Sequence, residues 1–437
     1  DLGYGDISCY GNKIIKTPNI DRLASQGIRF TDYYSPSPVC SPSRVGLLTG
    51  RTPNRAGIYD WIPSGTQFHL EEKEFTIPKM LKRVGYATCM SGKWHCNGKF
   101  NKKSQPQPGD FGFDHWFATQ NNAAPSHRNP KNFVRNGEGV GELEGFSCRI
   151  VAEEANRWIE NHVIENPDQP FFTFIAFHEP HEPISSPESM ISNYPNAQKK
   201  GEALYYANVE NMDFAVGMIM DCLNRNKVAE NTLVIFTSDN GPETLNRYGG
   251  AWRSHGSPGD LRGMKLHTHE AGIRVPGVMR WPLQIKAGQV SDEPVNSLDL
   301  MPTFANLAAG EIPIDIQLDG TDIVNAFGKD EVIRKRPMFW CYYSALNKSK
   351  VALRDGNWKL LASLKSKNDK YLKIRSLNKS NYDLVKTARL VDFELYNIGN
   401  DNDESLNLVD KNHDEFKRLS EAMRMMFDEV LKDSKIW

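Results

Sequence analysis

One apolar run, Phe-Phe-Thr-Phe-Ile-Ala-Phe at positions 171 to 177, constrains the fold more than any other feature of the chain. A run so rich in aromatic residues is typical of a strand that is buried on both faces. A helical pattern at Arg149 to Ile164 precedes this run. The same order of helix and then strand occurs twice more. The pairs are Ile77 to Val84 followed by Ala87 to Ser91, and Ala203 to Asn224 followed by Thr232 to Ser238. Strands that alternate with helices predict an α/β fold with a mainly parallel central sheet flanked by helices.

The C-terminal part of the chain has a different pattern. Short apolar segments separated by turns, followed by one charged amphipathic helix, predict a smaller α+β subdomain with an antiparallel sheet. The segments are Met338 to Tyr343, Val351 to Arg354, Trp358 to Ala362 and Phe393 to Tyr396, and the helix is His413 to Leu431. The lysine-rich stretch Ser366 to Lys386 is expected to be an exposed loop. We therefore divide the chain into a large domain, residues 1–333, and a C-terminal subdomain, residues 334–437.

Composition excludes several classes of protein. The formal net charge is −1, from 53 basic and 54 acidic residues, so we expect no nucleic-acid partner. No run of about 18 apolar residues occurs, so we expect no transmembrane helix and no membrane partner. The seven cysteines are scattered and form no Cys-x-x-Cys pair, which argues against a zinc cluster and against a disulfide-dense scaffold.

Polar residues follow two of the predicted strands. His178 and His181 come after the Phe171 to Phe177 run, and Asp239-Asn240 comes after the Thr232 to Ser238 run. Reactive groups gather at the carboxyl ends of strands in parallel sheets. The Asp-Asn pair supplies hard oxygen ligands, which suit calcium or magnesium better than zinc. Taken alone, Asp-Asn-Gly is equally good turn chemistry, so this segment leaves a metal site and a simple turn both open.

The most informative segment is Cys40-Ser41-Pro42-Ser43-Arg44, followed by Leu47-Leu48-Thr49-Gly50-Arg51. A helix pattern starts after Pro42, so Cys40 and Arg44 lie at a predicted helix N-terminus, where anions bind. The physical pattern indicates a nucleophile that faces an anionic substrate. A buried structural cysteine at a helix start would give the same local pattern.

This segment resembles the signature Cys-x-Pro-x-Arg of the formylglycine-dependent (type I) sulfatases, in the alkaline phosphatase superfamily. The resemblance covers the chain from Asp1-Leu2-Gly3 to Leu395-Tyr396-Asn397 and is closest to carbohydrate sulfatases such as N-acetylgalactosamine sulfatases. It implies a sulfuric ester hydrolase whose catalytic domain is residues 1–333. It also implies that a separate formylglycine-generating enzyme oxidises Cys40 to 3-oxoalanine (formylglycine), and that the hydrated aldehyde attacks sulfur.

The resemblance implies a calcium site as well. Its ligands would be Asp1, Asp239, Asn240 and the modified Cys40. Asp1 matches the second aspartate of the family's Asp-Asp-x-Gly, so the first aspartate and the first core strand are expected to precede Asp1.

Further catalytic roles follow from matching motifs. Gly92-Lys93-Trp94-His95 matches a family block in which the lysine binds sulfate and the histidine lies beside the formylglycine. Arg44 belongs to the cysteine motif, His181 matches the histidine before x-Pro, and Lys265 matches a sulfate-binding lysine. The resemblance implies that His181, assisted by Lys265, protonates the leaving oxygen, and that His95 accepts a proton when the aldehyde is regenerated.

Residues that would recognise the rest of the substrate lie on loops. Aromatic rings suit stacking on sugar faces, and charged or imidazole groups suit hydroxyl recognition. The residues that we expect to bind a sulfated sugar or oligosaccharide are His178, Asp60, Trp61, Trp252, Arg253 and His255, and further loop candidates are Tyr59, His115, Trp116, Arg247 and His269.

Three alternatives stay open at this point. One is a phosphomonoester or phosphonate hydrolase of the same superfamily, although Asp239-Asn240 stands where a second metal would need Asp-His. Another is a non-catalytic protein that binds sulfated glycans, and the third is an enzyme in which Cys40 was never oxidised. The family is periplasmic or secreted, or lysosomal in eukaryotes, so we expect one of these locations.

Overall fold

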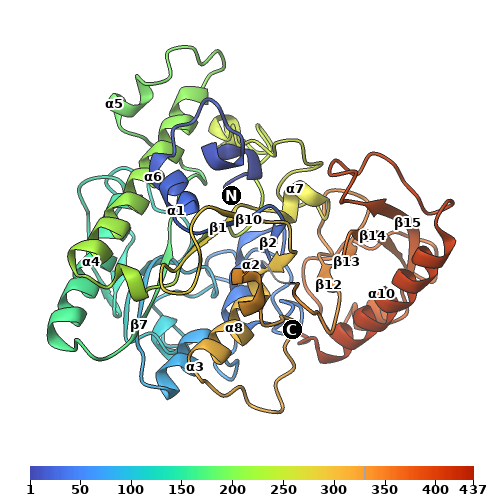
Figure 1. Cartoon of the computed structure of the whole chain (residues 1–437). Coiled ribbons are helices and arrows are strands. Elements are labelled where there is room, and N and C mark those ends of the chain that lie inside the picture. The colour runs from blue at the N-terminus through green and yellow to red at the C-terminus, as the bar shows by residue number, and fades with distance from the viewer. Residues whose placement is uncertain (329–330) are drawn as a thin grey trace.

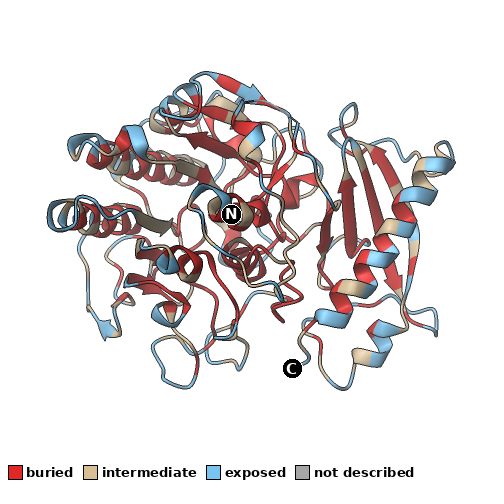
Figure 2. Ribbon diagram, turned by 60° about the horizontal axis from the view of Figure 1, so that its bottom comes forward, coloured by how far each residue is buried: buried red, intermediate tan, exposed pale blue. Residues whose placement is uncertain are grey.

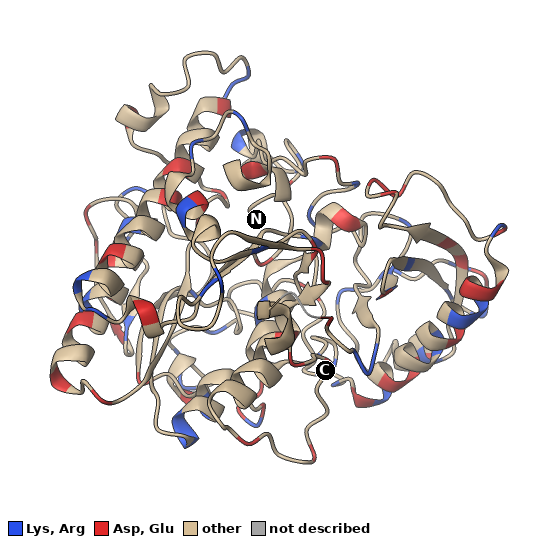
Figure 3. Cartoon of the chain, in the orientation of Figure 1, with Lys and Arg blue, Asp and Glu red and all other residues tan. Residues whose placement is uncertain are grey.

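The computed structural model describes residues 1–328 and 331–437. Figure 1 shows two lobes: a large one in which helices surround β-strands, and a smaller C-terminal one, coloured orange to red. The N-terminus lies near the middle of the large lobe in this view. Lys and Arg are interspersed with Asp and Glu over both lobes (Figure 3), in keeping with the small net charge. In the described part of the chain, we find no helix with both the length and the apolar character that a membrane crossing needs.

The strands of the large lobe form two main sheets. One has the order β6-β5-β4-β3-β7, and β3 pairs in parallel with both β4 and β7. The other has the order β10-β1-β9-β8, in which β9 runs antiparallel to β1 and β8. A short parallel pair, β2 and β11, lies apart from both. The bounds are β1 Ile28–Phe30, β2 Tyr33–Tyr34, β3 Ala87–Lys93, β4 His115–Thr119, β5 Val134–Arg135, β6 Glu138–Gly139, β7 Phe171–Ala176, β8 Val234–Thr237, β9 Gly277–Arg280, β10 Gln289–Ser291 and β11 Val295–Asn296.

The helices of the large lobe cover these sheets. Their bounds are α1 Pro18–Ser25, α2 Cys40–Thr49, α3 Ile77–Arg83, α4 Ser147–Glu165, α5 Glu188–Ile191, α6 Glu202–Arg225, α7 Glu270–Ile273 and α8 Leu300–Leu307. The long helices α4 and α6 pack on each other, and Ile159, Met212 and Val216 join one buried apolar cluster with Phe236 of β8. Each helix-then-strand pair expected from the sequence is present, so the α/β prediction is confirmed. The sheets are mixed, however, because parallel pairs such as β3 with β7 occur beside antiparallel pairs such as β8 with β9.

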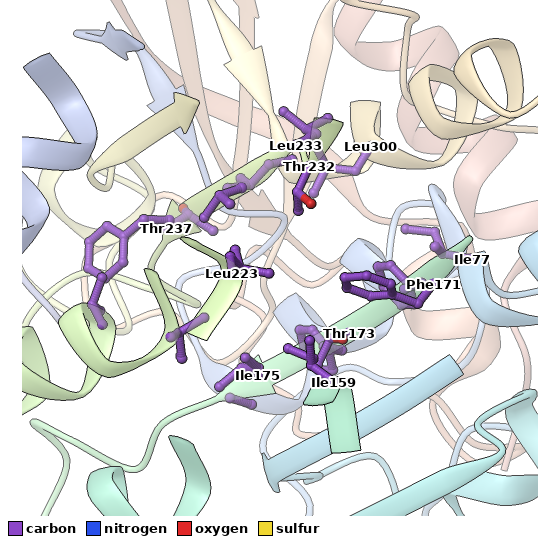
Figure 4. A pocket seen from close by; sticks show the side chains of 18 of the residues that line it. Ile77, Ile159, Phe171, Thr173, Ile175, Leu223, Thr232, Leu233, Thr237 and Leu300 are labelled. Atoms are coloured by element: carbon purple, nitrogen blue, oxygen red, sulfur yellow. The ribbon is translucent and has the colours of Figure 1, made fainter. Parts of the chain in front are cut away.

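A cavity of about 830 Å³ separates the two sheets. Its walls come from β7 and β8, which are edge strands of their sheets, with helices closing the ends. Figure 4 shows Phe171, Thr173 and Ile175 on one side and Thr232, Leu233 and Thr237 on the other. The predicted strand before Asp1 lies outside this sequence and stays a prediction.

The C-terminal lobe is one antiparallel sheet covered by a helix. Its strands run in the order β12-β13-β14-β15, with bounds β12 Met338–Cys341, β13 Val351–Asp355, β14 Trp358–Lys365 and β15 Arg389–Asn397. The amphipathic helix α10, His413–Asp433, lays its buried face on this sheet (Figure 2). The antiparallel C-terminal subdomain is therefore confirmed, while the boundary between residues 333 and 334 stays a prediction.

The prediction of an exposed loop for residues 366–386 is wrong in part, because many of these residues are exposed and most lie outside helices and strands, but not all of them. This segment contains the short helix α9, Tyr382–Lys386, and it buries Leu372, Leu377 and Val385 in the core of the C-terminal lobe. The many lysines make this segment look fully exposed in the sequence. A lysine can keep its charged group in water even where neighbouring apolar side chains are buried, so its presence did not exclude burial of these three residues.

A buried cluster of charges joins the two lobes. Lys359 of β14 contacts Glu270 of α7 at 2.7 Å and Glu404 at 2.9 Å, and all three side chains are fully buried. Burial raises the pKa of Glu404 to about 7, whereas Lys359 and Arg274 overcome the same effect and lower the pKa of Glu270 to about 2. Glu270 is therefore the ionised partner of Lys359 at neutral pH.

Replacing Lys359 with alanine is expected to lower the free energy of unfolding by about 3–5 kcal/mol, because Glu270 would remain as a buried charge with a lost partner. Urea denaturation measures this change. Arg225→Ala, which removes an exposed contact with Glu160, is the control and is expected to change it by less than about 1 kcal/mol. Equal, small effects of both substitutions would show that the cluster does not stabilise the junction.

Candidate active site

Cys40 is the first residue of helix α2, at the centre of the large lobe. Val39 is extended before it, and Pro42 lies in the first turn, where a missing N–H costs no intrahelical bond. The helix ends at Gly50, whose left-handed backbone lets its N–H bond to the carbonyl of Gly46. These signals fix Cys40 at the helix start, where its side chain is buried.

Arg44 connects three elements around Cys40. Its Nη1 donates to the Lys93 carbonyl at 2.7 Å, and its Nε and Nη2 donate to Asp239 Oδ2 at 3.1 and 2.8 Å. Against the effect of burial, the nitrogen of Asp1, followed by Arg44 and Lys93, holds the pKa of Asp239 well below its usual range. Burial lowers the pKa of Lys93 to about 8, although the nearby Cys40 and Asp239 oppose this shift.

Oxygen atoms from two segments meet beside Arg44. The amide of Asn240 donates to Asp1 Oδ1 at 2.8 Å, and the main-chain nitrogen of Asp1 lies 2.9 Å from Asp239 Oδ1. Lys265 Nζ also donates to the Asp1 carboxylate, at 2.8 Å. The structure thus brings three of the four predicted metal ligands, Asp1, Asp239 and Asn240, together with one predicted sulfate-binding lysine.

This oxygen set fits a hard cation. Within residues 1–328 and 331–437 no group of three His, Cys, Asp or Glu side chains is placed to hold a metal, and this set has only two carboxylates beside an amide. The buried Oδ1 of Asn240 has no hydrogen-bond partner among the described atoms. An uncompensated buried oxygen beside two carboxylates is the environment that calcium or magnesium prefers.

His95 is held in one tautomer. Its Nε2 lies 3.0 Å from the Ile62 carbonyl, which can only accept, so Nε2 carries the proton. Its buried Nδ1 has no partner within the described residues and therefore presents a lone pair. Burial, reinforced by Lys93 and Arg44, lowers the pKa of His95 well below its ordinary value. His95 is thus a neutral base at the site.

His181 and His178 occupy the loop after β7. The Nδ1 of His181 donates to the Glu182 carbonyl at 2.6 Å, which leaves Nε2 3.6 Å from Asp1 Oδ2. Burial and Lys265 lower the pKa of His181 well below its ordinary value. His178 bonds through Nε2 to Thr119 at 2.8 Å, and its carbonyl accepts from the His181 amide. His178 therefore supports the loop that presents His181.

The predicted substrate residues fall into two groups. Asp60 and Trp61 lie on the segment that follows Tyr59, and Asp60 contacts the C-terminal lobe. Trp252 and His255 instead contact Lys200, through a cation–π pair and a bond from His255 to the Lys200 carbonyl. Arg253 contacts Glu182 and donates to the Ile184 carbonyl, so it braces the His181 loop. The structure does not bring these two groups together through any contact of the described residues.

Sequence reasoning missed two residues of the site. Glu243 binds Arg247 at 2.6 and 2.8 Å and lies 3.4 Å from Lys265, so it orients both cations. Its spacing of four residues from Arg247 would indicate an ion pair on a helix, but this segment is not helical, so the spacing did not predict the contact. Tyr342, from the C-terminal lobe, packs in one buried cluster with Cys40. No local pattern marks Tyr342, because only the tertiary fold places it there.

The family comparison settles the class of this site. The model of the Sulfatase family matches residues 1–311, which include every residue predicted above to be catalytic or to bind metal. This chain belongs to the sulfatase family. It is therefore a sulfuric ester hydrolase. A second model, the C-terminal part of N-sulphoglucosamine sulphohydrolase, matches residues 264–373 of this sulfatase.

Individual relatives agree with this assignment. The sulfatase is 34% identical to human arylsulfatase A over 383 residues, covering 82% of this chain and 72% of the relative. It is 32% identical to N-acetylgalactosamine-6-sulfatase of Sus scrofa over 363 residues, covering 78% and 66%. The crystal structure of Ps i-CgsB in complex with k-i-k-neocarrahexaose superposes with a TM-score of 0.82 at 28% identity, covering 100% of this chain and 91% of the other. That similarity confirms the predicted fold class.

Proposed function

We propose that this sulfatase removes sulfate from a sulfated carbohydrate, with Cys40 as the precursor of a formylglycine nucleophile and with calcium held by Asp1, Asp239, Asn240 and the modified position 40. The convergence of Arg44, Lys93 and Lys265 on the Cys40 and Asp1 region carries this proposal. A sulfate ester is anionic, so a site of this kind must supply concentrated positive charge. When bound, calcium would add positive charge and polarise a sulfate oxygen.

The cationic side chains of the site have different roles in this proposal. Lys93 and Lys265 are buried cations on different segments, and they can bind separate oxygens of one sulfate group. Arg44 pairs with the Asp239 carboxylate and fixes the end of β3. Because these groups lie in a poorly solvated site, their attraction for developing charge is stronger than it would be in water.

Two histidines handle protons in this proposal. The free Nδ1 of His95 can accept a proton from a hydroxyl at position 40, because Nε2 is committed to the Ile62 carbonyl. His181 and Lys265 both contact the Asp1 carboxylate, and we assign to this pair the protonation of the leaving sugar oxygen. The ammonium of Lys265 supplies the proton, and Nε2 of His181, which holds no proton while Nδ1 donates to the Glu182 carbonyl, receives it and passes it to the leaving oxygen.

The sugar is proposed to bind on the side of Asp60 and Trp61. Trp61 exposes 43% of its surface and offers an indole face for stacking on a sugar ring. A formylglycine-generating enzyme is the proposed partner during maturation. The periplasm, the cell exterior, or the lysosome in a eukaryote is the proposed location.

A substrate panel tests this function. We expect hydrolysis of sulfated galactose and N-acetylgalactosamine and of p-nitrophenyl sulfate, with p-nitrophenyl phosphate turned over at least about 100-fold less efficiently. Sulfate release measured by ion chromatography gives kcat/KM for each compound. A preference for the phosphate would instead support the phosphomonoesterase alternative, and binding of sulfated sugars without any release would support the non-catalytic one.

A further inference from the structure

We propose that Asp60 and Tyr342 form a selectivity pair that accepts a hydrogen bond from a sugar hydroxyl or N–H next to the sulfate ester, and that excludes a second anionic group at that position. This inference rests on the proposed carbohydrate sulfatase function and adds the chemical class of the sugar. Its two members come from different lobes.

Tyr342 lies close to the nucleophile position. Tyr342 lies just after β12 and is buried in one apolar cluster with Cys40, Val39 and Leu266. A residue that packs in the same cluster as the nucleophile position lies within reach of a group bound next to the sulfate. Arg247 is near Tyr342 too, but its bidentate contact with Glu243 neutralises its charge.

The hydrogen bonds of Asp60 involve one of its two carboxylate oxygens and leave the other open to a ligand. The Tyr342 hydroxyl and the Trp61 amide both donate to Oδ1 of Asp60, at 2.9 and 2.8 Å. Ser344 lies within hydrogen-bonding reach of the carboxylate, but its single hydroxyl proton is donated to the Ile374 carbonyl at 2.9 Å, so among the described side chains no donor is committed to Oδ2. Asp60 is only partly buried, so Oδ2 remains available to a ligand. A carboxylate oxygen accepts hydrogen bonds and cannot donate them, so its partner must be a hydroxyl or an N–H.

The negative charge of Asp60 would also repel a sugar that carries a second anionic group at this position. Arg375 acts on Asp60 through space, but no ion pair joins the two side chains among the described residues. A uronate or a second sulfate on the sugar would place its negative charge beside this unpaired carboxylate. Like charges in a partly buried site repel strongly, so the pair favours a sugar with a single sulfate at this end.

The segment that carries Asp60 is held firmly. The Tyr59 hydroxyl donates to the Lys435 carbonyl, and the Trp437 indole donates to the Gly57 carbonyl at 2.7 Å. On the other side of Asp60, the Ile62 amide donates to Ser41, next to Cys40, at 3.0 Å. The residues after α10 therefore fix the distance between Asp60 and the nucleophile position, which a selective contact requires.

The test compares two substrates in one set of variants. Wild-type enzyme is assayed on the monosulfated galactose or N-acetylgalactosamine that it hydrolyses best, and on the same sugar with a second sulfate on the neighbouring hydroxyl. We expect the ratio of the two kcat/KM values to favour the monosulfated sugar. Asp60→Asn is expected to lower this ratio at least about tenfold, because one charge is lost at constant size.

Two further variants separate the effect of the hydrogen bond from the effect of the charge and control for the loss of a charge elsewhere. Tyr342→Phe is expected to lower the ratio by less than Asp60→Asn, since it removes one donor and no charge. Asp410→Asn removes an exposed charge elsewhere and is expected to leave the ratio unchanged. A ratio within twofold of wild type in both Asp60→Asn and Tyr342→Phe would overturn the selectivity pair alone. A wild-type enzyme that cleaves p-nitrophenyl sulfate but no sugar sulfate would overturn the carbohydrate function as well.

Discussion

Replacing Cys40 with serine is expected to reduce sulfate ester hydrolysis by at least about 10⁴-fold, because a serine hydroxyl cannot become the aldehyde hydrate that the proposed mechanism needs. Cysteine and serine are similar in size, so the buried start of α2 is expected to keep its packing and the free energy of unfolding to change by less than about 1.5 kcal/mol. Steady-state kinetics with p-nitrophenyl sulfate and urea denaturation measure the two effects.

Cys9→Ser is the matched control for this substitution. Cys9 is a free thiol that lies outside the site, with its amide bonded to Asp21. We expect this variant to retain wild-type kinetics. Substantial activity in Cys40→Ser, at a tenth of wild type or more, would mean that the nucleophile lies elsewhere.

Replacing Asp239 with asparagine is expected to lower kcat/KM by about 10²- to 10³-fold, because it removes one of two carboxylates that would hold calcium and the partner of Arg44. Calcium binding offers a readout that does not depend on turnover. Isothermal titration of chelator-treated protein is expected to show one calcium site in the wild type and at least tenfold weaker binding in the variant.

Asp221→Asn provides the control for charge loss. Asp221 is an exposed residue of α6 in contact with Arg22 at 3.5 Å, and no hydrogen bond or ion pair joins it to the metal ligands among the described residues. This variant is expected to bind calcium as the wild type does. Equal calcium affinity in Asp239→Asn would remove Asp239 from the ligand set.

The parts of the structure that could be predicted from the sequence are local. The helix-then-strand pairs are visible because each strand is a continuous apolar run and each helix has its own periodicity. The Cys40 segment is readable for the same reason, since its cysteine, proline, arginine and C-terminal glycine all act within one helix. The motif match then located Lys93, His95, His181 and Lys265, but their contacts with one another required the fold.

The parts that could not be predicted depend on distant segments. Asp60 meets Tyr342 across 282 positions of sequence, and Tyr59 meets Lys435 across 376. Arg253 has the residue type expected of a substrate contact, yet it is used to brace Glu182. A charged side chain on a loop gives no sign of which partner it will find, so the sequence alone could not separate binding residues from bracing ones.

The most direct test measures the chemical state of Cys40 against activity. Enzyme is prepared with increasing amounts of a formylglycine-generating enzyme, and the mass of the peptide that contains Cys40 gives the fraction converted. Conversion lowers the mass by the exchange of one sulfur for one oxygen and the loss of two hydrogens. We predict that kcat for a sulfated sugar rises in proportion to this fraction and falls to background when it is zero. Full activity in a preparation whose Cys40 is entirely thiol would contradict the proposed mechanism.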